Sequence, residues 1–567
     1  MIRTFKTHRI RNQVELTGNL WEFEACSGDH KGEKYLMHTP SCWENHPDFS
    51  DYRGEGIYRK LVTAGGNLRL ECKGVSHTAT VYFDGVEIIN HYNAYTAFSV
   101  LIPNVEHGEH LIEIKVDNRF GETSALHFPN DYMSYGGISR GVILEELQDA
   151  YIQYVHVTPY FDGEKWNGRI ECGVSFLGQQ EDDAFEIEIK IANQIVRKEL
   201  NYSDKKEIVI KEDMSFTDIA TWDVENPKLY EVETKLMRNC VEIDDLIDRF
   251  GFREVKVEGK HILLNNRKIR IKGVCRHEDH PQYGCALPYH AIAYDLMQIH
   301  HMGANAIRTS HYPNDEIFLD LCDELGILVW EENHARGIEE EQMKNPYFKE
   351  QAENVIKEMI PQHYNHPSIF IWGILNECAS ETMYGRECYK AQFDLIKSLD
   401  STRPYTFASC KFFRDICFDL PDVISCNVYP RWYVDKTVEE YLSEIKEWIK
   451  EDGKGAKKPF VISEIGAGGI YGYRNEYEGK WTEEYQAKAL KEQVETCLSF
   501  EDCCGVFIWQ FCDIRVSEEW FASRPRGMNN KGLVDEFRRK KLGYFVVRDI
   551  FCRVGNYFED AYSAWRV

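Results

Sequence analysis

The sequence has no apolar run long enough to span a membrane, and it is poor in positive charge. Its 67 lysines and arginines face 93 aspartates and glutamates, which gives a formal net charge of −26. Nucleic acids and anionic membrane surfaces are polyanions, so this balance argues against both as partners. An anionic small molecule would need a dedicated cation at its binding site.

The sequence also lacks the cysteine spacing of a zinc site. Its 18 cysteines include neighbours such as Cys503 and Cys504, but no C-x-x-C arrangement. The first residues, MIRTFKTH, are polar and basic, and no apolar core follows them as in a secretory signal peptide. We therefore expect free thiols, no metal site and a cytoplasmic protein.

No low-complexity linker divides the chain, yet 567 residues are too many for one core. Residues 1–148 contain segments with alternating apolar and polar side chains, such as 78–83 and 110–116, and a typical hairpin turn at Asp84–Gly85. The same alternation continues over residues 149–256, at the size of an immunoglobulin domain. We predict a jelly-roll β-sandwich followed by an immunoglobulin-like β-sandwich.

From residue 257 onward, strands alternate with amphipathic helices. A predicted strand at 268–274 precedes a helix at 291–300, and a helix at 314–325 ends before Gly326. Eight such alternations in about 300 residues are the number that a (β/α)8 barrel requires. The chain is therefore predicted to be multidomain, with a TIM barrel over residues 257–567.

Two apolar runs in this region end on a carboxylate. Residues 368–377 end on Asn376 and Glu377, and residues 459–464 end on Glu464. Such runs are typical of strands buried on both faces, and barrel strands carry catalytic groups at their C-terminal ends. The carboxylates are 464 − 377 = 87 residues apart, which is about three βα units of roughly 30 residues. They then end strands four and seven and face one mouth, as glycoside hydrolysis requires, although glutamates that only cap loops remain the alternative.

Seven short motifs occur in order along the chain. They are YGGISR at 135–140, NPKLY at 226–230, RFGFR at 249–253, GVCRHED at 273–279, RTSHYP at 308–313, WGILNE at 372–377 and SE at 463–464. Through these motifs the chain resembles glycoside hydrolases of family 2, the group of β-galactosidases, β-mannosidases and β-glucuronidases, over nearly its whole length. The resemblance implies a sugar-binding jelly roll, an immunoglobulin-like sandwich and a barrel, in agreement with the division above.

The resemblance also implies a retaining mechanism, with Glu377 as acid/base and Glu464 as nucleophile. The carboxyls of a retaining enzyme stand about 5–5.5 Å apart. Like charges at that distance separate the two pKa values, so that one group is protonated while the other is ionised. In the same family pattern, Asn376 hydrogen-bonds the sugar 2-hydroxyl, Tyr429 hydrogen-bonds the nucleophile and His311 binds the substrate.

One further motif concerns the identity of the sugar. Asn529-x-Lys531 resembles the Asn-x-Lys motif with which β-glucuronidases hold the C6 carboxylate, where an ammonium supplies charge and an amide a second donor. An arginine precedes this motif in the family, and Arg526 is expected in that role, with Arg524 as the alternative. Sugar-contacting positions are further expected at Asp131, Asn427, Tyr433 and Trp509.

Three functions stay open. The first is a retaining exo-β-glycosidase that hydrolyses β-D-glucuronides, with β-galacturonides as the alternative within hexuronidase activity. The second is a neutral-sugar β-galactosidase, in which Asn529 and Lys531 form only a turn. The third is a non-catalytic carbohydrate-binding protein, against which the two glutamates argue.

No cofactor is implied by the sequence. The polar cluster His277, Glu278 and His280 suggests structural hydrogen bonds at a strand end rather than a metal site. The expected partner is a small-molecule or oligosaccharide β-glycoside with a uronic acid, and we expect a homo-oligomer. The chain between Glu331 and His366 is short, which predicts an open site.

Overall fold

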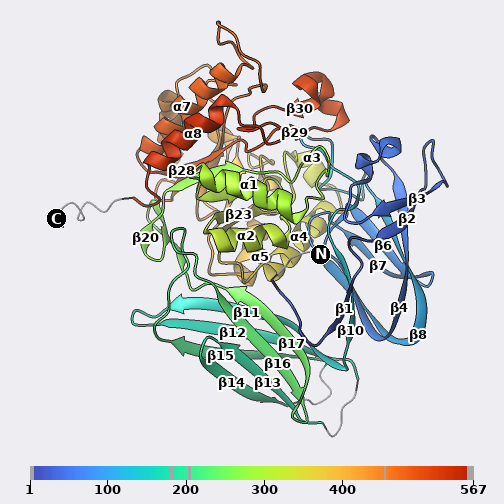
Figure 1. Ribbon diagram of the computed structural model, residues 1–567. Coiled ribbons are helices and arrows are strands. Elements are labelled where there is room, and N and C mark those ends of the chain that lie inside the picture. Colours follow the sequence, from blue (N-terminus) through green and yellow to red (C-terminus); the bar gives the residue numbers. More distant parts are fainter. Residues whose placement is uncertain (1–4, 179–182, 202–205, 453–454, 559–567) are drawn as a thin grey trace.

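The computed structural model describes residues 5–178, 183–201, 206–452 and 455–558 (Figure 1). Two β-sandwiches and a closed barrel of parallel strands make up the protein. The first sandwich is blue in Figure 1, the second is teal to green below it, and the barrel lies in the centre. The predicted multidomain class is confirmed, and the boundaries at residues 148 and 256 stay a proposal.

The first sandwich is built around one long antiparallel ladder. Its strands are β1 (Asn12–Glu15), β2 (Leu20–Ala25), β3 (Lys34–His38), β4 (Glu55–Cys72), β5 (Val75–Ser76), β6 (Thr78–Phe83), β7 (Val86–Tyr92), β8 (Phe98–Asp117), β9 (Gly137–Ile138) and β10 (Val142–Leu147). β4 pairs with β8, and register shifts between Ala64 and Leu68 mark the bulge at which such a ladder can bend. The predicted hairpin joins β6 to β7, with φ of 50° at Asp84 and 78° at Gly85, as a type I′ turn requires.

The second sandwich packs a sheet of three strands against a sheet of four. Its strands are β11 (Ala150–Phe161), β12 (Trp166–Phe176), β13 (Phe185–Ile191), β14 (Gln194–Leu200), β15 (Glu207–Phe216), β16 (Tyr230–Arg238) and β17 (Val241–Phe250). Alternate side chains of both sheets, such as Ile170, Val174 and Ile187, are fully buried between them. This burial is the physical cause of the alternation in the sequence.

The barrel closes through eight parallel strands. They are β21 (Ile271–Cys275), β22 (Ala306–Arg308), β23 (Leu328–Glu332), β24 (Ile369–Ile374), β25 (Tyr405–Ser409), β26 (Ile424–Asn427), β27 (Phe460–Ile465) and β28 (Cys503–Ile508), and β28 pairs back with β21. The helices are α1 (Tyr289–His301), α2 (Glu316–Leu325), α3 (Glu340–Met343), α4 (Phe348–Gln362), α5 (Met383–Leu399), α6 (Val438–Asp452), α7 (Glu483–Ser499) and α8 (Leu542–Arg553). No helix among the described residues is both long enough and apolar enough to cross a membrane.

The predicted first barrel strand at 268–274 is divided in the structure. A small sheet of β18 (Val255–Glu258), β19 (His261–Leu264) and β20 (Arg267–Lys268) precedes the barrel. β19 and β20 are joined by a turn in which Asn265 and Asn266 both have positive φ. The first barrel strand therefore begins only at Ile271, because Lys268 pairs within the small sheet.

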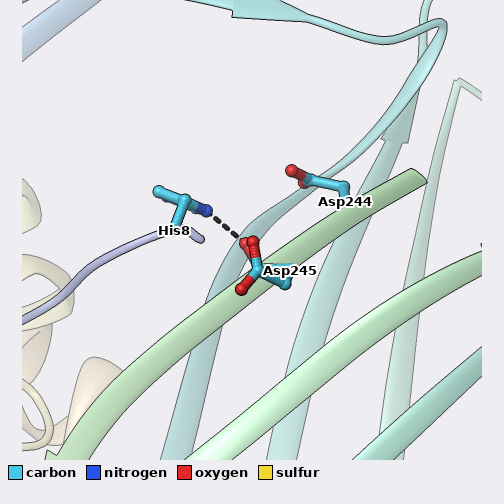
Figure 2. Close-up of side chains that lie close together, drawn as sticks. All are labelled: His8, Asp244 and Asp245. Atoms are coloured by element: carbon cyan, nitrogen blue, oxygen red, sulfur yellow. Dashed lines mark hydrogen bonds between the residues drawn. The ribbon is translucent and has the colours of Figure 1, made fainter. Parts of the chain in front are cut away.

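The first sandwich and the N-terminal segment are tied to the rest of the chain by a buried ion pair and by contacts to backbone carbonyls. Arg140 donates to Glu278 at 2.9 Å and to the carbonyl of Pro313 at 2.8 Å, which fixes the sandwich to the barrel. Figure 2 shows His8 against Asp244 and Asp245 of β17, where the His8 ring contacts the Asp245 carbonyl. These contacts hold three parts of the chain together around the barrel.

Candidate active site

The two predicted carboxylates lie on the barrel strands that the sequence indicates. Glu377 follows β24, the fourth barrel strand, and Glu464 lies near the end of β27, the seventh. Leu375 and Glu377 have φ of 47° and 54°, a region that residues other than glycine seldom adopt. Non-glycine residues held in this region are often found at functional sites.

A cavity of about 250 Å³ lies between these carboxylates and the first sandwich. Its lining consists of Asp131, Arg336, Glu377, Cys410, Phe412, Asn427, Tyr429, Tyr433, Val434, Tyr441, Glu464, Trp509, Arg524 and Lys531. Eight of the twelve predicted site residues are among them. Asn376, His311 and Asn529 are buried beside this lining, whereas Arg526 lies elsewhere.

Glu464 is surrounded by hydrogen-bond donors. Its Oε1 accepts from Arg308 at 2.8 Å, and its Oε2 accepts from the Tyr429 hydroxyl at 2.7 Å. Burial raises the pKa of Glu464 to about 7, and the charge of Glu377 adds to this rise. Arg308 and Tyr429 oppose it, because both favour the ionised form. Glu464 therefore changes charge near neutral pH.

Glu377 has fewer partners than Glu464. Its Oε1 accepts from Asn427 at 2.9 Å, and its Oε2 lies 3.6 Å from a nitrogen of Arg336. The charge of Glu377 acts on the pKa of Glu464, so the two carboxyls share one electrostatic environment. The raised pKa falls on Glu464, the nucleophile of the family pattern, so the assignment of the acid role to Glu377 rests on that pattern and not on the pKa of Glu464.

The side-chain amide of Asn376 forms hydrogen bonds through its oxygen but not, among the described residues, through its nitrogen. Its Oδ1 accepts from Arg308 at 2.8 Å and from Asn427 at 3.1 Å. Its Nδ2 is buried and has no hydrogen-bond partner among the described residues. An unsatisfied buried donor is costly, so this N–H group is available to a ligand oxygen.

His311 lies behind the cavity as a neutral imidazole. Its Nδ1 contacts Glu332 at 2.7 Å, and its ring stacks on Trp509 with centroids 5.1 Å apart. Burial lowers the pKa of His311 well below its usual value, and the nearby charge of Arg308 lowers it further. Its Nε2 is 3.9 Å from Glu464.

Lys531 is the cation of the site without a counter-ion. Its side chain is buried, with 4% of the residue exposed, and its Nζ lies 5.2 Å from the centroid of the Tyr433 ring. It forms no ion pair with any aspartate or glutamate among the residues that the structure describes. The ammonium hydrogen-bonds Tyr433 and its charge acts on Asp131, but no carboxylate of the described residues lies within ion-pair distance of it, so an anionic ligand would supply that partner.

The first sandwich contributes one carboxylate, Asp131, to the cavity. Asp131 contacts Arg336 at 3.1 Å and Arg524 at 3.3 Å, and it accepts from the Asn529 amide at 3.2 Å. Burial would raise the pKa of Asp131, but the charges of Arg336 and Lys531 lower it to about 2. Asp131 is therefore ionised and neutralises part of the positive charge.

The charged residues of the lining leave an excess of cations. They are Asp131, Glu377, Glu464, Arg336, Arg524 and Lys531. When the two glutamates share one proton, three cations face two anions. The cavity is then positive in a chain whose net charge is −26.

The structure places Arg524, and not Arg526, at the cavity. The guanidinium of Arg526 pairs with Glu536, and its φ of 63° breaks the local 3₁₀ turn. Arg336 was not predicted from the sequence, because it lies in none of the seven family motifs. The only signal is the run ENHAR at 332–336, which begins on the last residue of β23.

Two clusters of three possible metal ligands occur among the described residues, His8 with Asp244 and Asp245, and Asp320 with Asp323 and His366. Protein donors already occupy their oxygens. Asp245 accepts from two backbone N–H groups, Asp244 accepts from Arg11, and Asp323 contacts His366 at 2.6 Å. Neither cluster lies at the cavity.

The residues of the polar run after β21 have protein partners as well. His277 contacts the Tyr312 hydroxyl at 3.2 Å, and Glu278 accepts from Arg140. His280 accepts from the backbone N–H of Gln282 at 3.1 Å. The side chains of this polar run therefore form hydrogen bonds within the protein.

Solved structures and characterised relatives resemble the whole chain. A crystal structure of a family 2 β-galacturonidase from Eisenbergiella tayi, bound to galacturonate, is 54% identical with a TM-score of 0.94, and the match covers 98% of this chain and 100% of that chain. A β-glucuronidase from Streptococcus agalactiae is 26% identical, over 94% of this chain and 95% of its own length. A β-galactosidase from Thermoanaerobacterium thermosulfurigenes is 28% identical, over 91% of this chain and 69% of its own length.

Two family models also match. The model for the TIM barrel domain of glycosyl hydrolases family 2 covers residues 255–555, and a second model of glycosyl hydrolases family 2 covers residues 150–253. Together they span the second sandwich and the barrel, and the first of them alone covers more than half of the chain. The protein is a glycoside hydrolase, and the chain belongs to glycoside hydrolase family 2.

Proposed function

We propose that this protein is a retaining exo-β-hexuronidase, which removes a terminal β-linked uronic acid. The observation that carries the proposal is the buried ammonium of Lys531, which has no carboxylate partner among the described residues and lies in the same cavity as Glu377 and Glu464. A neutral sugar would leave that buried charge without a carboxylate in ion-pair distance. A C6 carboxylate would pair with it.

Within hexuronidase activity, we propose a preference for β-galacturonides, with β-glucuronides as the second substrate. The support is the 54% identity to the Eisenbergiella tayi β-galacturonidase, which is far above the 26% identity to the Streptococcus agalactiae β-glucuronidase. The two sugars differ only in whether the C4 hydroxyl is axial or equatorial. The sequence reasoning put glucuronides first, and the order is reversed here on the strength of that identity.

In the proposed mechanism Glu464 attacks C1 and forms a covalent glycosyl-enzyme, while Glu377 protonates the leaving oxygen. Arg308 and Tyr429 hold the attacking carboxylate by the two hydrogen bonds at 2.8 Å and 2.7 Å. The free N–H of Asn376 is the donor for the sugar 2-hydroxyl. Glu377 then activates water as a base to release the sugar.

Lys531 pairs with the C6 carboxylate in this proposal, and Arg524 takes the role that the sequence reasoning gave to Arg526. Asp131 holds Arg336, Arg524 and the amide of Asn529 in place around the sugar. A neutral galactoside, the substrate class named for the Thermoanaerobacterium thermosulfurigenes relative, carries no negative charge with which this cationic cluster could pair.

Two further expectations belong to the same proposal. A cytoplasmic location is supported by the cysteines, all 18 of which are free thiols. A homo-oligomeric state remains a proposal, to be measured by light scattering on the purified protein.

The test is a comparison of kcat/KM for the p-nitrophenyl β-galacturonide, β-glucuronide and β-galactoside. We expect the galacturonide to be hydrolysed fastest and the galactoside slowest. A wild-type protein that prefers the galactoside would refute the hexuronidase proposal. A preference for the glucuronide would refute only the choice between the two uronic acids.

A further inference from the structure

Two cysteines from different parts of the fold contact each other where the first sandwich meets the barrel. Cys42 lies between β3 and β4 of the first sandwich, and Cys285 lies between β21 and α1 of the barrel. Their Sγ atoms are 3.5 Å apart, although 285 − 42 = 243 positions separate the two residues in the chain. The contact of the two thiols therefore depends on the docking of the first sandwich on the barrel.

The backbone beside Cys285 approaches Cys42 closely because residue 284 is a glycine. A Cβ atom at Gly284 would lie 2.8 Å from the Sγ and 3.1 Å from the Cβ of Cys42, and the φ of Gly284 is 56°. Both cysteines belong to a small apolar cluster that includes Met133 and Ala286. The backbone thus brings the two side chains together, and apolar neighbours confine them there.

The two thiols differ in their access to solvent. Cys42 is 2% exposed, whereas Cys285 is partly exposed. Burial raises the pKa of Cys42 well above its usual value, and the contact with Cys285 raises it further, so Cys42 is a thiol at neutral pH. A small oxidant therefore meets Cys285 first and leaves Cys42 next to the oxidised sulfur. An accessible cysteine beside a second one is the arrangement of redox-sensitive pairs.

We propose that Cys42 and Cys285 form a reversible disulfide bond when the protein meets hydrogen peroxide, and that this bond fastens the first sandwich to the barrel. The Cys285 sulfur takes one oxygen from the peroxide as the O–O bond breaks, which gives a sulfenic acid and one water. The Cys42 sulfur then attacks the Cys285 sulfur, the S–O bond breaks, and the hydroxide leaves with the Cys42 proton as a second water. Two thiols lose two electrons in all, and one peroxide is reduced to two waters.

The disulfide requires only a small movement. Its sulfurs stand about 2.05 Å apart, so the two side chains together must close a gap of about 1.5 Å. A dithiol such as dithiothreitol reverses the bond by thiol–disulfide exchange. Transient disulfides of this kind also occur in cytosolic proteins, so the bond is compatible with the proposed location.

The position of the pair determines what the bond changes. Met133 of the same cluster follows Asp131 by two residues, and the neighbouring Asn130 accepts from Arg336 at 2.8 Å. The bond therefore holds the part of the first sandwich that reaches the sugar cavity. The lining of that cavity includes neither cysteine, so turnover itself should not change. Closing a loop of 243 residues should instead stabilise the docked fold, because it restricts the unfolded chain.

The test treats the purified full-length protein with hydrogen peroxide and then with dithiothreitol. Peptide mapping without reductant should give a linked peptide that contains Cys42 and Cys285. The unfolding temperature should rise by about 3–6 °C and return to its first value after dithiothreitol. The kcat/KM for the p-nitrophenyl glycoside that wild type hydrolyses fastest should stay within about twofold.

Two variants serve as the matched pair. Cys285→Ser removes the accessible thiol and keeps a side chain of similar size, so peroxide should give neither the linked peptide nor the temperature rise. Cys240→Ser removes an exposed thiol in the turn between β16 and β17, and it should behave as wild type does. Since the comparison of wild type before and after dithiothreitol requires no variant, a poorly folded Cys285→Ser leaves the test intact.

Four results would overturn the proposal. Peroxide-treated wild type with both thiols still free, or with Cys285 oxidised to a sulfinic acid beside a free Cys42, would show that the two sulfurs do not form a redox pair. A linked peptide found only in a covalent dimer would place the bond between two copies of the chain. A linked peptide within one chain and no rise in unfolding temperature would refute the fastening of the first sandwich.

Discussion

Replacing Lys531 by alanine removes the ammonium that we assign to the substrate carboxylate. A hydrogen bond to a charged partner contributes about 1.5–3 kcal/mol. This range corresponds to roughly a 10- to 150-fold loss in kcat/KM. Because Lys531 is 4% exposed and has no carboxylate partner among the described residues, little solvent screens the contact, and we expect the upper half of that range.

The assay measures kcat/KM for p-nitrophenyl β-galacturonide and β-galactoside with wild type and with the variant. The loss should be confined to the uronide, and the galactoside should remain within a few fold of its wild-type rate. Lys531→Met is the matched control for packing, because it keeps an unbranched apolar side chain against the Tyr433 ring. Methionine and alanine should therefore lose the uronide activity to a similar extent.

A parallel fall on both sugars would contradict the reasoning, since Lys531 would then support the fold or the catalytic pair. Thermal unfolding of each variant separates these two cases. Full uronide activity in Lys531→Met would also refute it, because no charge would then be needed.

Further predictions concern the two glutamates and their pH dependence. Glu464→Ala should abolish turnover on every glycoside, and added azide should restore some activity and give a glycosyl azide of inverted configuration. Glu377→Ala should spare a dinitrophenyl glycoside far more than a methyl glycoside, because the dinitrophenolate leaves without a proton; equal losses on both would reverse the assignment. Since burial raises the pKa of Glu464 to about 7 and the nucleophile must be ionised, kcat/KM should fall as the pH drops below about 7. Tyr429→Phe removes a donor that favours the ionised form, so this acid limb should move to higher pH by about one unit; an unmoved limb would assign it to another group.

The barrel and its two carboxylates could be predicted because their signals are local in sequence. Strands buried on both faces give apolar runs, and the runs that end on Glu377 and Glu464 became β24 and β27. The hairpin at Asp84–Gly85 was predictable for a similar reason, since its turn chemistry lies in two adjacent residues.

The arrangement of cations around the sugar could not be predicted from local signals. Arg336 and Asp131 are 205 residues apart (336 − 131) and meet only because the first sandwich docks on the barrel. Arg524 and Arg526 are nearly adjacent, and only the backbone turn at Arg526 decides which one reaches the cavity. The alternating segment at 110–116 is only the last part of β8, because the register of the β4–β8 ladder shifts before it.

The most direct test is a crystal structure of Glu377→Gln with bound methyl β-galacturonide, whose poor leaving group needs the proton that this variant cannot supply. It should place the C6 carboxylate within hydrogen-bond distance of Lys531 Nζ, and C1 about 3–3.5 Å from Glu464, as in-line attack requires. A sugar whose carboxylate points to solvent, or whose C1 faces away from Glu464, would contradict the proposed activity.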